Sequence, residues 1–135
     1  MNISSRCEYA LRAMLALARR HGSEPMTSTA IAEERNIPEK YLVHIMLQLK
    51  KAGLVRSVRG AQGGYLLARS PNSITLHDVV TAVDGPILHP LPVEASGSED
   101  LAPAWADVAK GVADVLGDTT IQSIADRSQA DMYYI

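Results

Sequence analysis

The strongest constraint on the fold is a glycine-rich basic segment, RGAQGG at residues 59–64. It separates two short apolar stretches, at 54–58 and 65–68. Short apolar or β-branched stretches joined by a glycine-rich segment are typical of a β-hairpin with a tight turn. The sequence therefore predicts one small hairpin whose tip carries a basic side chain, Arg59.

Three segments before the hairpin show helical periodicity. They lie at residues 5–20, 29–34 and 38–52, and their apolar residues recur at helical spacing. In the third segment the residues expected to face inward are Tyr41, Leu42, Ile45, Met46 and Leu49. A short helix, a tight turn, a second helix and a hairpin follow one another in a winged helix-turn-helix. The predicted fold class is therefore mostly α with a small β-hairpin wing.

The chain changes in character after the hairpin. A fourth helix is expected at 75–84, whereas the next residues are rich in Pro, Gly and Ser without a periodic pattern. Helical spacing returns at 105–117, in a long helix with one apolar face, and a further turn or two follows at 121–127. The predicted organisation is a winged helix-turn-helix at 1–84, a linker loop at 85–103, and a long helix with a C-terminal tail at 104–135.

The formal net charge of -2 hides an uneven distribution of charge. Residues 1–70 carry eleven Lys and Arg against five acidic residues, whereas residues 71–135 carry two against ten. A basic front half favours contact with phosphate, and the acidic rear half is repelled by it. This asymmetry predicts double-stranded DNA as a partner, the alternative being a chance separation of charges.

The third helical segment is the predicted recognition helix, because the second helix of a helix-turn-helix fits into the major groove. Such helices present their N-terminal residues to base edges and their far end to phosphates. The candidates for base contacts are Glu39, Lys40, Val43 and His44. The candidates for phosphate contacts are Lys50 and Lys51.

The hairpin supplies a second predicted contact with DNA. Glycines make its tip thin enough for the backbone to approach a duplex closely, and Arg59 beside them suits insertion into a minor groove. These glycines are Gly60, Gly63 and Gly64. Glycine also serves ordinary hairpins, and the helices alone are equally compatible with a small bundle that binds no nucleic acid. The order of helices and hairpin together favours DNA binding.

The hairpin and its flanks resemble a known family. Residues 52–67 are similar to the GLV-x-S-x-RG-xx-GGY-xL signature of the IscR/CymR (Rrf-two type) regulators, and the resemblance covers nearly the whole chain. It is closest to the CymR-type members, which hold no iron–sulfur cluster. The resemblance implies a homodimeric, sequence-specific, cytoplasmic DNA-binding regulator, with repression as its expected action and cysteine or sulfur metabolism as its expected target.

The resemblance also gives the long helix a role. In this family the penultimate helix forms the dimer interface, so residues 104–135 become a dimerisation helix followed by a tail. The residues to which this role falls are Trp105, Val108, Val112, Val115 and Leu116.

The chain departs from the family in its potential ligands. Cluster-binding members carry three cysteines in the linker, where this chain has none, and a [2Fe–2S] cluster needs four ligands. We therefore expect no cofactor. Val43 and His44 replace a Glu-Gln pair that is frequent in the recognition helix, so the operator sequence is expected to differ.

Three alternative functions follow from other residues. The single cysteine, Cys7, is expected to be a semi-buried structural residue, but exposure at a helix N-terminus would lower its pKa and allow oxidant sensing. A metal sensor would use His77, Asp78, Asp84 and His89. An interaction protein would bind a partner enzyme in place of DNA. The scattered histidines form no catalytic arrangement, so no enzyme is expected and no catalytic residue is assigned.

The C-terminal tail is the candidate for a partner contact. An apolar C-terminal residue beside its carboxylate can be captured by backbone amides and a pocket. CymR-type resemblance implies cysteine synthase as the partner of Tyr133, Tyr134 and Ile135. The alternative is that these side chains pack on the protein's own dimer core. No apolar run is long enough for a membrane span, so no contact with a membrane is expected. The expected location is the cytoplasm.

Overall fold

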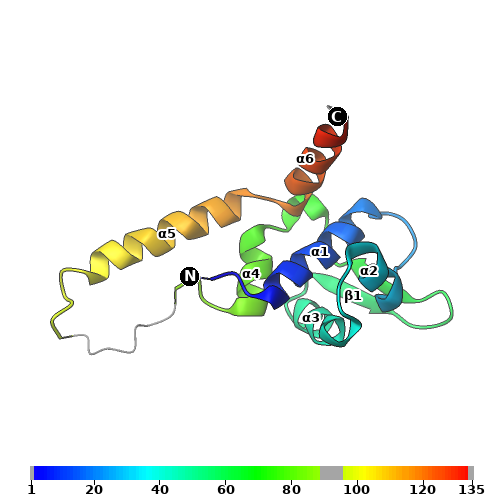
Figure 1. Cartoon of the computed structure of the whole chain (residues 1–135), viewed down its shortest axis with the longest axis horizontal. Helices are drawn as coiled ribbons and strands as arrows, with labels where there is room; N and C mark the ends of the chain where they lie inside the picture. The colour runs from blue at the N-terminus through cyan, green and yellow to red at the C-terminus, as the bar shows by residue number, and fades with distance from the viewer. Residues whose placement is uncertain (1, 89–95, 134–135) are drawn as a thin grey trace.

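A computed structural model describes residues 2–88 and 96–133, with side chains up to residue 127. Figure 1 shows a globular part, built from the N-terminal helices and a hairpin, from which one long helix extends. The elements in chain order are α1 Ser5–Arg19, α2 Ser28–Arg35, α3 Glu39–Lys51, β1 Val55–Val58, β2 Gly64–Leu67, the 3-10 helix η1 Pro71–Ser73, α4 Leu76–Asp84, α5 Ala102–Asp118 and α6 Ile121–Tyr133. The winged helix-turn-helix architecture is confirmed, with α2 and α3 as its helix pair.

α1 is the centre of the core. Its N-cap is Ser4, whose hydroxyl oxygen accepts a hydrogen bond from the backbone N–H of Cys7 at 3.0 Å. The helix buries one continuous face among residues of α2, α3, α4 and the hairpin. The buried residues of α1 are Cys7, Ala10, Ala13, Met14, Ala16 and Leu17.

α3 matches the predicted inward face at four of five positions. Leu42, Ile45, Met46 and Leu49 are fully buried. The prediction that Tyr41 faces inward is wrong, because its side chain is 41% exposed. Tyr41 lies at the border of the apolar stripe, where its ring stacks on that of Tyr9 at the surface.

The hairpin forms as predicted and pairs with the chain ahead of α2. β1 and β2 are antiparallel, with Val55 opposite Leu67. A further bridge joins Tyr65 of β2 to Met26, through hydrogen bonds of 2.7 and 3.0 Å in the two directions. Strand β2 of the wing is therefore fastened to the segment that leads into the helix-turn-helix.

Two helices are longer than the sequence pattern predicts. α5 begins at Ala102, inside the predicted linker, with Pro103 in its first turn, where proline costs no hydrogen bond. α6 continues to Tyr133, beyond the one or two turns predicted. Its first turn buries Ile121, whose N–H donates to the carbonyl of Ile74 at 2.9 Å.

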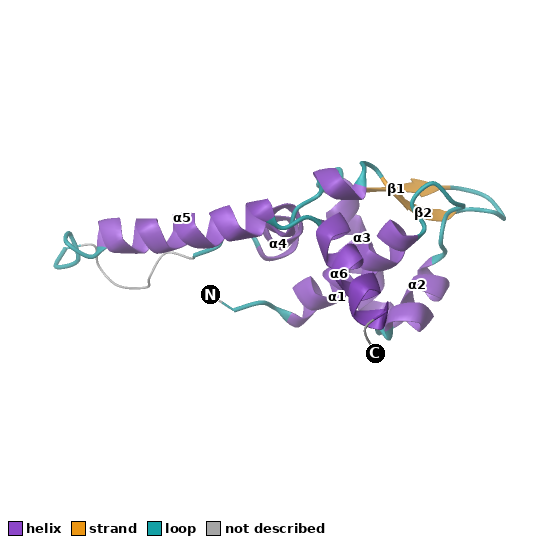
Figure 2. Cartoon of the chain, turned by 90° about the horizontal axis from the view of Figure 1, so that it is seen from above, coloured by secondary structure: helices purple, strands orange, loops and turns teal. Residues whose placement is uncertain are grey.

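α5 contacts α4 but extends away from the rest of the globular part. Figures 1 and 2 show it extending from the globular part on the side opposite to the hairpin. None of its side chains is buried. Among the helices of the described residues, none combines the length and the apolar character required to cross a membrane.

Cys7 is fully buried, which contradicts the hypothesis of an exposed, oxidant-sensing thiol. It belongs to the core-facing side of α1, and a nearby contact fastens the start of this helix to the end of α4. The carboxylate of Asp84 accepts hydrogen bonds from the backbone N–H of Ser4 at 3.2 Å and from its hydroxyl at 2.5 Å. Burial, together with the negative charge of Asp84, raises the pKa of the Cys7 thiol to about 11.

The raised pKa of Cys7 predicts a loss of stability at alkaline pH. Between about 8.5, the ordinary pKa of a cysteine thiol, and about 11, the unfolded chain releases the thiol proton while the folded chain retains it. Rising pH therefore favours unfolding, by roughly 1–3 kcal/mol across this window. Chemical denaturation at several pH values should show the wild type losing stability relative to Cys7→Ala. A difference between the two proteins that does not change with pH would contradict this prediction.

Candidate nucleic-acid interface

The turn between α2 and α3 is held by α1. Asn36 ends α2 in the left-handed conformation, with φ 53°, which asparagine adopts more readily than most residues. The guanidinium of Arg12 donates to the carbonyl oxygens of Arg35 and Asn36 at 3.4 and 3.2 Å. Ile37, the next residue, is buried. The angle at which α3 leaves this turn is thus fixed by contacts with α1.

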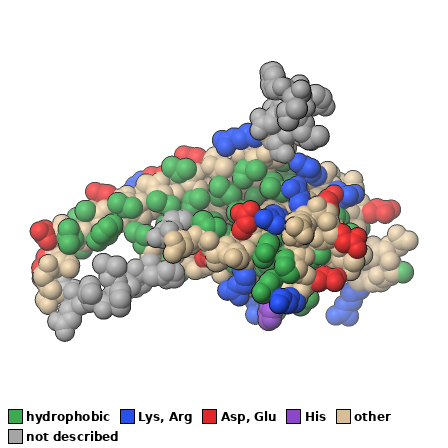
Figure 3. Space-filling model, viewed as in Figure 1, with side chains coloured by type: hydrophobic (Ala, Val, Ile, Leu, Met, Phe, Trp, Pro, Cys, Tyr) green, Lys and Arg blue, Asp and Glu red, His purple; other side chains and the backbone are tan. Residues whose placement is uncertain are grey.

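The outer face of α3 is exposed and cationic. Its buried residues lie on one side of the helix, so helical spacing places positions 40, 44, 47 and 51 on the opposite side. In Figure 3, Lys, Arg and His side chains gather at the lower edge of the globular part, where α3 lies in the same view of Figure 1. The predicted contact residues on this helix are all exposed: Glu39, Lys40, Val43, His44, Lys50 and Lys51.

Two of these side chains contact other parts of the protein. The carboxylate of Glu39 accepts a hydrogen bond from the Thr29 hydroxyl of α2 at 2.8 Å. The ammonium of Lys50 donates to the Ser57 hydroxyl of β1 at 2.9 Å. Both contacts are exposed to solvent, so DNA could exchange for them at little cost. The second contact links Lys50 of α3 to the wing.

An aromatic column that the sequence analysis missed supports the start of α3. The rings of Tyr9 and Tyr41 stack with centroids 6.1 Å apart and planes 16° from parallel. The guanidinium carbon of Arg12 lies 5.2 Å from the Tyr9 ring centroid, and the ammonium of Lys40 lies 5.0 Å from that of Tyr41. The sequence signal that could have indicated this column is a tyrosine at the border of each apolar stripe, one on α1 and one on α3. The column orients Lys40 at the first turn of the recognition helix.

The three glycines of the wing occupy positions that require glycine for different physical reasons. A Cβ at Gly63 would lie 2.2 Å from the carbonyl oxygen of Val58 in the hairpin, and a Cβ at Gly64 would lie 2.3 Å from that of Met26, ahead of α2. Side chains are therefore excluded at both positions. A Cβ at Gly60 would meet no atom within 4 Å, although its φ of +110° favours glycine. Gly60 and the exposed Arg59 therefore form the open tip of the wing.

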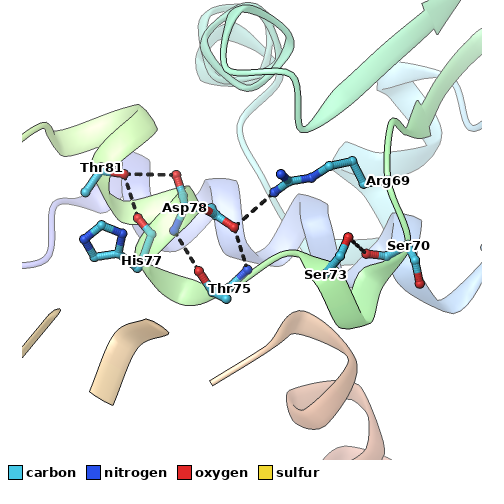
Figure 4. Close-up of polar contacts among 7 residues, drawn as sticks. All are labelled: Arg69, Ser70, Ser73, Thr75, His77, Asp78 and Thr81. Atoms are coloured by element: carbon cyan, nitrogen blue, oxygen red, sulfur yellow. Dashed lines mark hydrogen bonds and ion pairs between the residues drawn. The ribbon is translucent and has the colours of Figure 1, made fainter. Parts of the chain in front are cut away.

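The other end of the hairpin is tied to α4. Figure 4 shows the carboxylate of Asp78 accepting from the Arg69 guanidinium and from the Thr75 N–H, both at 3.0 Å. The Thr75 hydroxyl accepts from the Asp78 N–H at 3.1 Å and completes a capping box. The Arg69 pair is partly exposed, so it contributes no more than about 1 kcal/mol. Its main effect is to hold the chain that leaves the wing against α4.

The apolar residues of α5 lie together on one face, as predicted for a dimer interface. Figure 3 shows hydrophobic side chains along this helix. Trp105 is 51% exposed and Val115 is 66% exposed, values unusual for large apolar residues. A shallow apolar groove on this face is lined by Val108, Gly111, Val112, Val115 and Leu116.

Two predictions concern residues outside the described part. The structure does not describe the side chains of Tyr133, Tyr134 and Ile135, so their contact with cysteine synthase stays a prediction. His89, one member of the alternative metal site, is also outside it. Within residues 2–88 and 96–127, no three His, Cys, Asp or Glu side chains lie close enough to share a metal ion.

The family model "Rrf2: Iron-dependent Transcriptional regulator" matches residues 3–127. An iron site or an iron–sulfur cluster requires several thiolate, imidazole or carboxylate ligands in one place. The described part of this chain gathers no such set, and its single cysteine is buried in the core. The described residues therefore do not fit an iron group.

Individual relatives and solved structures agree with this match. The HTH-type transcriptional regulator CymR of Bacillus subtilis (strain 168) is 38% identical over the full length of both chains. The HTH-type transcriptional regulator IscR of Pectobacterium carotovorum subsp. carotovorum is 32% identical, over 98% of this chain and 89% of the relative. The solved structure of B. subtilis CymR, described as the global cysteine regulator, superposes with a TM-score of 0.78 at 35% identity, over 94% of this chain and 98% of that one. These relatives are regulators and not enzymes, and the chain belongs to the Rrf2 family of transcriptional regulators.

Proposed function

We propose that this chain is a homodimeric, sequence-specific DNA-binding regulator that inserts α3 into the major groove. The observation that carries the proposal is the division of α3 into two faces. Four large apolar residues fix its inner face in the core, while its outer face is exposed and cationic. A helix held so rigidly along one side presents its other side with a defined geometry, as base recognition requires.

The wing is the second contact in this proposal. Arg59 and Gly60 form an exposed tip, and Lys50 links the recognition helix to strand β1 of the wing through its contact with Ser57. A lone arginine on a thin turn suits the narrow minor groove beside the major groove that α3 occupies. Lys51, at the end of α3, is placed for a phosphate.

The uncovered face of α5 supports the homodimer. A 17-residue helix with no buried side chain gains little stability within one chain. Pairing with the same face of a second copy would cover Trp105, Val108 and Val115 by a two-fold contact. Two recognition helices related by that two-fold axis would bind a pseudo-palindromic site.

The proposal also includes the genes that this chain regulates. B. subtilis CymR, the similar structure with 35% identity, is described as a global cysteine regulator. By this similarity the proposed targets are genes of cysteine metabolism, and the proposed action is repression. The charge of the chain supports DNA as the partner, because Lys and Arg are concentrated in the half that contains α3 and the wing.

Substitutions on α3 and the wing test DNA binding. Sites should first be selected from random duplex DNA, and affinities then measured at several salt concentrations. Lys51→Ala should weaken binding to all sequences and flatten the salt dependence, because one phosphate contact is lost. His44→Ala should instead change the base preference. Arg59→Ala should cost about 1–3 kcal/mol of binding free energy.

Lys110→Ala is the matched control for Lys51→Ala. Lys110 is exposed and lies on α5, where it pairs with Asp114 at 2.7 Å. Its removal should leave affinity and salt dependence unchanged. If Lys51→Ala and Lys110→Ala have equal effects, α3 is not the element that contacts the duplex.

A charge in the apolar face of α5 tests the homodimer. Val115→Asp would place a carboxylate from each copy in the proposed apolar contact, so the variant should sediment as a monomer at micromolar concentration, where the wild type is expected to be a dimer. Val115 is 66% exposed in a single chain, so the monomer fold should persist. Ala106→Asp adds the same charge on the opposite face of α5 and should leave the dimer intact. A wild type that sediments as a monomer would refute the proposed assembly.

A further inference from the structure

The recognition helix carries an exposed apolar pair that its role in folding does not explain. Val43 is 64% exposed and Leu47, one turn later, is 49% exposed. The core is already supplied by four other residues of α3. Leu47 lies beyond the N-terminal positions to which base contacts are usually assigned, and the sequence analysis did not single it out.

The surroundings of this pair indicate the kind of partner that covers it. Positions 40, 44, 47 and 51 follow one another along the outer side of α3, so Leu47 lies between His44 and Lys51. Lys40 lies at the start of the same row. An apolar protein partner would have to strip water from these ammonium groups without compensation. A partner that carries negative charges at its edges and an apolar group between them fits this arrangement of lysines and apolar side chains better.

The major groove of DNA has this composition. Phosphates line its edges, and the 5-methyl group of thymine is the apolar group that its floor presents. We propose that Val43 and Leu47 recognise thymine methyl groups, so that this chain distinguishes thymine from bases that lack the methyl. The proposal rests on the proposed DNA-binding function and adds the chemical class of base that these two positions select.

The two side chains suit this role by shape. They are branched hydrocarbons without a hydrogen-bonding group, so they gain by covering a methyl and lose where they face an unpaired donor or acceptor. One helical turn separates them, which lets them contact methyl groups on neighbouring base pairs. The Lys40 and Lys51 ammonium groups on either side would reach the phosphates that border the same stretch of groove.

The test replaces thymine by deoxyuridine, which lacks the 5-methyl group and keeps the same base-pairing groups. A duplex selected from random DNA by the wild type would be resynthesised with deoxyuridine at one thymine position at a time. We expect one or two positions in each half-site to lose affinity by about fourfold per methyl, the factor for burial of one CH₂ group. Leu47→Ala or Val43→Ala should abolish the difference between thymine and deoxyuridine at its own position.

Two further variants make the result specific. Leu47→Met keeps an apolar side chain at the same place and should retain most of the discrimination. Leu101→Ala removes an equally exposed leucine, 50% exposed, at the start of α5 and should leave the thymine-to-deoxyuridine ratio unchanged. Because Leu47 is half exposed, Leu47→Ala should melt within a few degrees of the wild type, which separates loss of contact from loss of fold.

The possible outcomes separate this proposal from the one on which it rests. A selected duplex whose affinity is the same with thymine and deoxyuridine at every position overturns methyl recognition and leaves DNA binding intact. Discrimination that survives in the Val43→Ala, Leu47→Ala double variant also overturns it. Failure to select any duplex at all overturns DNA binding itself, and with it the role of the pair.

Discussion

α1 buries Met14 and Leu17, together with the small residues Ala10 and Ala13, in the core that it shares with α3. The other features of the molecule depend on this contact. Once Leu42, Ile45, Met46 and Leu49 are committed to that core, helical geometry forces the remaining side chains of α3 outward. α1 supplies the polar restraints as well. Arg12 holds the turn before α3, and Tyr9 supports its first residues. One helix therefore sets the position, the angle and the presented face of the recognition helix.

The globular part and α5 differ in how far their apolar side chains are covered within one chain. The globular part buries most of its large apolar residues within one chain, whereas no side chain of α5 is buried. Charge follows the same division, because the basic residues gather with α3 and the wing while α5 and α6 contribute mainly acidic ones. A polyanion is attracted to one end and repelled from the other. The apolar face of α5 thus lies where DNA does not compete for it and a second copy can reach it.

Sequence patterns correctly predicted the helices and the hairpin, which depend on interactions between residues close together in the chain. Periodicity placed α1, α3 and α4 to within a residue or two, and the glycine-rich segment located the wing. The expected burial of Cys7 is confirmed, and near it Ser4 binds Asp84, 80 positions further along the chain. Predictions failed where distant residues decide. Tyr41 faces outward because Tyr9 offers a stacking surface on another helix. Leu47 was missed because periodicity shows only that a residue is apolar, and exposure becomes visible once the core is complete.

A short paired segment joins the two ends. Residues 74–76, just before and at the start of α4, exchange backbone hydrogen bonds with residues 119–121, between α5 and α6. The Leu76 N–H donates to the Thr119 carbonyl at 2.9 Å, beside the capping box in which Asp78 also binds Arg69 at the end of the wing. These contacts connect the junction of α5 and α6 to α4 and, through Asp78 and Arg69, to the end of the wing. In a dimer paired through α5, we therefore expect the separation of the two recognition helices, and with it the spacing of half-sites, to depend on this junction.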